Sequence, residues 1–99
     1  MKLETNRIYT LKLATGEEVV AKVLSVGTDM LEIEQPISVV LGPQGLQMMP
    51  NLFSADHQHP VQLNTSCCVC VAETRDDIRN SWIEATTGIR TVSKQIITG

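Results

Sequence analysis

The spacing of apolar residues changes once along this chain, near Thr74, and this change constrains the fold more than any other feature. Before Thr74, apolar and polar residues alternate in short segments such as residues 9–13 and 30–34. A period of two is typical of β-strands that bury one face. After Thr74 the period becomes that of an α-helix. The sequence therefore predicts a mainly β fold with one C-terminal helix.

The predicted helix covers residues 75–87. Ile78, Trp82 and Ala85 follow one another at intervals of four and three residues, which places them on one helical face. The hydroxyl of Thr74, with a carboxylate three residues later, is typical of an N-terminal capping box. We expect Trp82, the only tryptophan, to anchor the helix over the open end of the sheet.

Turn signals divide the first two thirds of the chain into five or six short strands. Glycines mark turns near residues 16, 27 and 42–45, and a polar loop spans residues 54–60. Residues 19–26 are apolar on both faces, which indicates neighbours on either side of that strand. The longest predicted strand covers residues 61–71. This pattern favours a small β-barrel over a sandwich.

Length and composition indicate one domain with a hydrophobic core. The chain has 99 residues, 42% of them apolar and 19% charged, which excludes a disordered protein. We expect residues 1–88 to form the barrel and helix, and residues 89–99 to form a tail. In the tail, Ile96 and Ile97 allow two alternatives, a frayed end or strand addition at a sheet edge.

Residues 11–33 resemble the first conserved segment of Sm-like (LSm) proteins. Gly16, Val19, Val23, Asp29 and Leu31 match that segment in kind. The chain is also similar to small Sm-like proteins encoded by T4-like marine phages. The resemblance implies a strongly bent five-stranded barrel and a homo-oligomeric ring built by strand-edge pairing. The three closely spaced cysteines at residues 67–70 indicate a cytoplasmic protein, which means the host cytoplasm if the gene is viral.

The residues with which Sm-like proteins bind RNA have no counterpart in this chain. Glu32 stands where the family carries an Asn, and the Arg-Gly pair of the second conserved segment is absent. Residues 23–74 contain no Lys or Arg, whereas affinity for nucleic acids comes largely from phosphate neutralisation. We therefore favour a protein–protein assembly module. The alternative is a divergent RNA-binding protein that uses the remaining cations Lys12, Lys22, Arg75 and Arg79 on another face.

The predicted oligomer interface follows the long strand at residues 61–71. This strand is apolar on one face and free of charge, so an exposed edge needs a partner strand. Its candidate interface residues are Val61, Leu63, Val69 and Val71.

Histidines and cysteines supply the remaining candidate sites. On an extended segment His57 and His59 would point the same way and could share a metal, so a metal-binding phage protein is a further alternative. Cys68 and Cys70 lack the two-residue spacing of zinc knuckles, and we expect them to pack beneath the helix as reduced, cytosolic thiols. No residue pattern indicates catalysis, a cofactor or a membrane span, and we expect a non-enzymatic protein.

Overall fold

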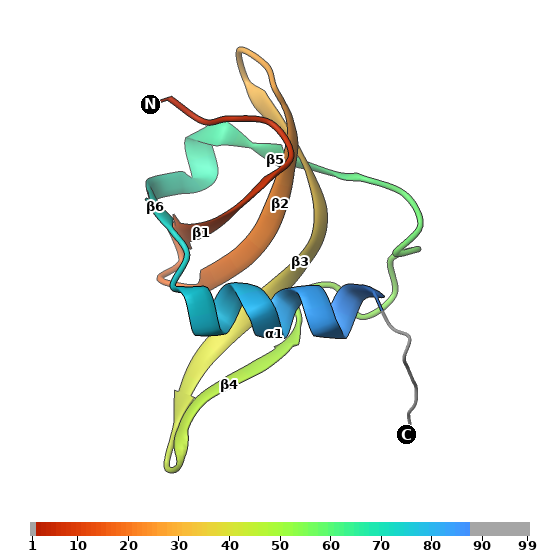
Figure 1. Ribbon diagram of the computed structural model, residues 1–99. Coiled ribbons are helices and arrows are strands. Elements are labelled where there is room, and N and C mark those ends of the chain that lie inside the picture. Colours follow the sequence, from red (N-terminus) through yellow and green to blue (C-terminus); the bar gives the residue numbers. More distant parts are fainter. Residues whose placement is uncertain (1, 88–99) are drawn as a thin grey trace.

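The structure, a computed structural model, describes residues 2–87 (Figure 1). It confirms a mainly β fold with one C-terminal helix, which begins one residue later than expected. The tail prediction for Ile96 and Ile97 lies outside the described residues. The elements are β1 (Arg7–Leu13), β2 (Glu18–Val26), β3 (Met30–Gly42), β4 (Gly45–Pro50), β5 (Val61–Asn64), the 3-10 turn η1 (Thr65–Cys67), β6 (Cys68–Glu73) and α1 (Asp76–Thr87).

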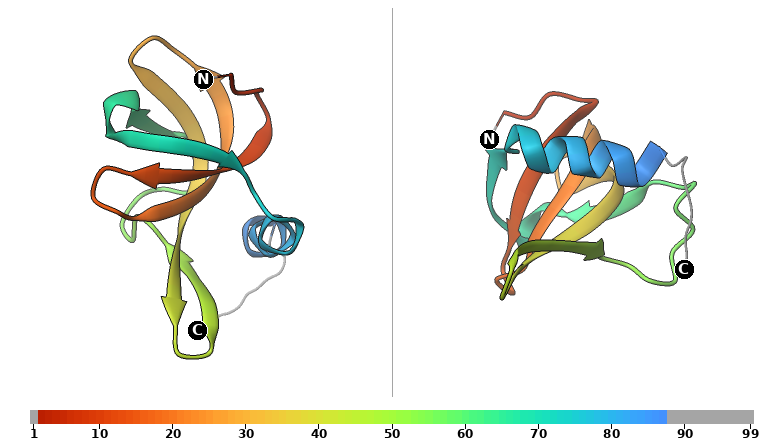
Figure 2. Two further views of the ribbon diagram at one scale, coloured as in Figure 1. Left: turned by 90° about the vertical axis from the view of Figure 1, so that its left-hand side faces the viewer. Right: turned by 60° about the horizontal axis from the view of Figure 1, so that its bottom comes forward.

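Six antiparallel strands fill five positions in the sheet. The strand order is β4-β3-β2-β1-β6, and β5 also pairs with β3. Because β2 occupies one edge of β3, β4 and β5 share the other edge, along residues 37–42 and 30–33 respectively. The sheet curls so that η1 links β5, near one end of this order, to β6 at the other end (Figure 2). The result is a strongly bent, rolled sheet.

A bulge marks the point where β3 changes its partner from β5 to β4. Lys22 pairs with Glu34 and Val20 with Ile37, so that residues 35 and 36 both lie opposite Ala21. Gln35 has a positive φ of 48°, which fits a bulged residue. Pro36 is tolerated at this position because the hydrogen-bond ladder between β2 and β3 is already interrupted.

Two hydrophobic clusters lie on opposite faces of this sheet. The inner cluster consists of Tyr9, Leu11, Ala21, Val23, Leu31 and Ile33. The outer cluster consists of Val20, Ile37, Val39 and Trp82. Neighbouring residues of β2 therefore belong to different clusters, which confirms the expectation that this strand is covered on both sides.

Helix α1 packs on the outer face of the sheet, and not over its open end as expected. Trp82 is 3% exposed and contacts the outer cluster together with Ile78. The Nε1–H of Trp82 donates a hydrogen bond of 2.9 Å to the carbonyl oxygen of Gln35 in the bulge. The expectation that Trp82 anchors the helix is thus confirmed. Ala85, expected beside it, remains exposed.

Two local predictions were wrong. The long strand at residues 61–71 is interrupted by η1, because the Asn64 side chain accepts hydrogen bonds from the backbone N–H and the hydroxyl of Ser66 and turns the chain. Thr74 does not cap α1. Its buried hydroxyl lies 3.0 Å from that of Thr10 on β1 and anchors the connection between β6 and the helix.

Candidate interaction surface

The hairpin formed by β3 and β4 carries the largest group of exposed apolar side chains on the described part of the molecule. It projects away from the rolled sheet (Figure 2). Residues 35–55 contain no charged side chain. The exposed apolar residues of the hairpin are Leu41 (82%), Leu46 (44%), Met49 (42%) and Val40 (38%).

The pairing register places these residues on both faces of the hairpin. Leu41 pairs with Leu46, and Ser38 pairs with Met49, so Met49 shares a face with Val40. A strand pair that is apolar on both faces is typical of a buried sheet, whereas a solvated hairpin has one polar face. The tip of this hairpin therefore has the composition of an interface.

A cleft of about 380 Å³ lies between the base of the hairpin and α1. Met48, Met49 and Pro50 of the hairpin line one side, and Ala85 and Thr86 of the helix line the other. Among the described residues that line the cleft, only His57 is titratable. The cleft extends the uncharged surface of the hairpin to the end of α1.

Strands β4 and β6 lie at the two ends of the sheet, and within residues 2–87 no strand pairs with their outer edges. Unpaired edges are normally protected by charged residues or prolines. Strand β4 has only Pro50 at its end, and the only charge of β6 is Glu73, which is bound to Arg7. Both edges are therefore open to pairing along most of their length.

The four residues predicted for the oligomer interface do not share one surface. Val61, Leu63 and Val71 are partly buried and pack against the inner cluster. Val69 is 65% exposed, because the register between β1 and β6 shifts at this point and leaves it as the extra residue of a bulge. The edge of β6 thus presents Val69, whereas the other three side chains support the core.

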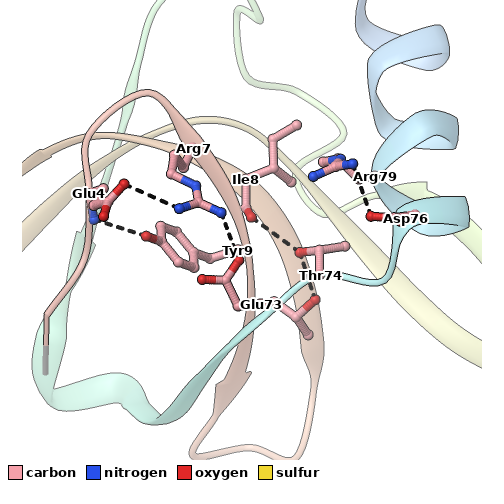
Figure 3. A network of polar contacts seen from close by, with 9 residues as sticks. Glu4, Arg7, Ile8, Tyr9, Glu73, Thr74, Asp76 and Arg79 are labelled. Carbon is pink, nitrogen blue, oxygen red and sulfur yellow. Dashed lines mark hydrogen bonds and ion pairs between the residues drawn. The ribbon is translucent and has the colours of Figure 1, made fainter.

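A polar network ties β6 and the start of α1 to β1 (Figure 3). Arg7 bonds to Glu73 at 2.9 Å and to Glu4 at 3.2 Å, and these contacts raise the pKa of Arg7. Thr74 contributes its contact with Thr10, and Tyr9 accepts a hydrogen bond from the backbone of Glu4. This network fixes the position of β6 at the end of the sheet.

The cations predicted for RNA binding are largely engaged within the chain. Lys22 lies over the ring of Trp82, with its Nζ 5.9 Å from the ring centroid. Arg79 pairs with Asp76 at 2.9 Å. Arg75 bonds to Asp77, and this hydrogen bond lowers the pKa of the Asp77 carboxyl. Lys12 is exposed on β1 with no ion pair among residues 2–87.

The two histidines lie on a turn within the predicted polar loop, and not on the extended segment that the metal hypothesis assumed. The backbone N–H of His59 donates to the carbonyl of Asp56 at 3.1 Å, and that of Gln58 donates to the Asp56 carboxylate at 3.0 Å. The His59 ring is 3.5 Å from the same carboxylate. No group of three or more candidate metal ligands comes together among residues 2–87.

The cysteines differ from the expectation and from one another. Cys68 packs against the inner cluster, not beneath the helix, and burial raises the pKa of its thiol. Cys67 and Cys70 are exposed. Two residues separate Cys67 from Cys70, a spacing typical of metal-binding cysteines. The sequence analysis missed this spacing because it compared only Cys68 with Cys70.

No protein-family model matches the chain, and no curated protein is significantly similar to it. No helix among residues 2–87 is both long and apolar enough to cross a membrane.

Proposed function

We propose that this protein is a non-enzymatic assembly module of the Sm-like kind, which forms a homo-oligomeric ring through strand-edge pairing. The observation that carries the proposal is the tip of the β3–β4 hairpin, which is uncharged and carries exposed apolar side chains on both faces. Such a surface buries its side chains only when another molecule covers it.

A second copy of this chain is the partner that the two edges favour. Among residues 2–87, β4 has an uncharged outer edge with no partner strand, and β6 has a second such edge at the opposite end of the sheet, where the single charge, Glu73, is paired with Arg7. Pairing β4 of one copy with β6 of the next joins two different surfaces, and repetition of such a contact closes a ring when the rotation permits. The chain carries a net charge of −3, so contact between copies is most favourable at these two edges, which carry little charge.

The interface is tested by placing a charge on one edge. In Val69→Lys the exposed side chain of β6 becomes a cation at the centre of the proposed contact. Contact between two copies would then remove the ammonium group from water without pairing it with an opposite charge, which is unfavourable. The matched control is Val26→Lys, because Val26 is also exposed, at 47%, and lies at the end of β2. We expect Val69→Lys to reduce the oligomer mass in size-exclusion chromatography with light scattering, and Val26→Lys to leave it unchanged. Equal masses for both variants would contradict edge pairing through β6.

A further inference from the structure

We propose that each subunit interface of this ring holds a zinc ion, bound by Cys67 and Cys70 of one copy and by His57 and His59 of the next. This inference rests on the proposed strand-edge pairing. Two thiolates and two imidazoles form a complete tetrahedral ligand set for zinc. Each half of the set has fewer ligands than a structural zinc site needs, and no group of three comes together within residues 2–87.

The two halves lie at opposite ends of the sheet. Cys67 ends η1, and Cys70 lies on β6, one outer strand. His57 and His59 lie in the loop between β4 and β5, the two strands that share the outer edge of β3. Pairing β6 of one copy with the outer edge of β4 in the next therefore brings the cysteines toward the histidines.

Cys70 and His57 also share a face of the sheet. Ile8 packs in the outer cluster, and because side chains alternate along β1, Lys12 points to the same face. Cys70 pairs with Lys12 and shares that face. His57 lines the cleft beside Ala85 of α1, which covers the outer face. In a closed ring the outer face of each copy continues into that of its neighbour.

The exposure of the individual thiols matches this role. Cys67 and Cys70, which have the two-residue spacing, are exposed, whereas Cys68 between them is turned into the inner cluster. His57 and His59 are also exposed. The ligand atoms are therefore accessible to a metal ion and to a second chain.

The first experiment measures zinc bound to the full chain. Protein stripped with a chelator is incubated with Zn²⁺, passed through a desalting column and analysed by atomic emission. We expect a stoichiometry of one zinc per subunit interface. The double variants Cys67→Ser/Cys70→Ser and His57→Ala/His59→Ala should each lose the metal, and the controls Cys68→Ala and Gln58→Ala should retain it. Loss of zinc in either control, or its retention in either double variant, would overturn the ligand assignment.

The second experiment tests whether the site is shared. The two double variants are refolded together. An interface in which the histidine variant supplies β6 and the cysteine variant supplies the histidine loop then contains both intact ligand pairs. Zinc binding should then return to at most about half of the wild-type value, since the opposite orientation has neither pair. No recovery in oligomers shown to be mixed would overturn a shared site.

The two proposals fail in different ways. A wild-type oligomer that binds no zinc contradicts the zinc site and leaves the assembly module intact. A wild-type monomer with or without zinc contradicts the assembly module, and with it the shared site.

Discussion

Replacing Trp82 tests how the helix is attached to the sheet. An aromatic side chain buries about 150–250 Å². At ~25 cal/mol per Å², this burial is worth about 4–6 kcal/mol, and truncation of a buried tryptophan to alanine typically costs about 3–5 kcal/mol. A domain of this size has a free energy of unfolding of about 5–15 kcal/mol, so Trp82→Ala is expected to lose a large part of its stability.

Trp82→Phe is the more informative variant because it keeps most of the apolar area in the outer cluster. It removes the indole N–H that bonds to Gln35 at 2.9 Å, and leaves the carbonyl of the bulge without that donor. A lost partner of this kind costs about 1–3 kcal/mol. Each kcal/mol lowers the melting temperature of a domain of this size by about 4–8 °C, so we expect a decrease of about 4–24 °C.

Thermal unfolding is followed by far-ultraviolet circular dichroism, which does not depend on the tryptophan that is removed. The matched control is Ile83→Ala, at the next position of α1, where the side chain is 40% exposed. This control is expected to change stability by no more than about 0.5 kcal/mol. If Trp82→Phe melted at the same temperature as Ile83→Ala, the hydrogen bond to the bulge would not contribute to docking of the helix.

Two further predictions follow from the exposure and charge of side chains. With iodoacetamide, metal-free native protein should show two fast thiols, Cys67 and Cys70, and one slow thiol, Cys68, whose raised pKa and burial both reduce the reactive thiolate; equal rates for all three would contradict this placement. Single-stranded RNA should bind weakly and with strong salt dependence, because residues 23–74 contain no cation and Lys22, Arg75 and Arg79 are engaged within the chain; sub-micromolar binding of oligo-U or oligo-A at physiological salt would refute this charge argument.

Periodicity predicted the elements that local pattern determines. The alternation at Tyr9 and Leu11 identified two side chains that the structure places in the inner cluster. The apolar residues on both faces of β2 correctly predicted that other side chains pack against both faces of this strand. The helix was predicted within one residue, because Ile78 and Trp82 lie on the face that contacts the sheet.

Alternation failed where a side chain changed the backbone path without a glycine or proline to mark it. The apolar pattern continues from Val61 to Val71, yet the side chain of Asn64 starts a 3-10 turn and a bulge at Val69 shifts the register. The signal available in the sequence was Asn64 followed by Thr65 and Ser66, since residues of these types compete with strand pairing through local hydrogen bonds.

The candidate surface was less predictable than the fold. The absence of charge in residues 35–55 is visible in the sequence, but the exposure of Leu41 and Met49 depends on how far the hairpin extends beyond the helix. The placement of Cys70 on the same face as α1 also depends on its pairing with Lys12, a tertiary register that no local pattern determines.

Native mass spectrometry of the wild-type chain at micromolar concentration tests the central claim most directly. The account predicts a single closed species whose mass is a whole multiple of the 10.9 kDa chain. A spectrum containing only the monomer would contradict assembly through the edges of β4 and β6.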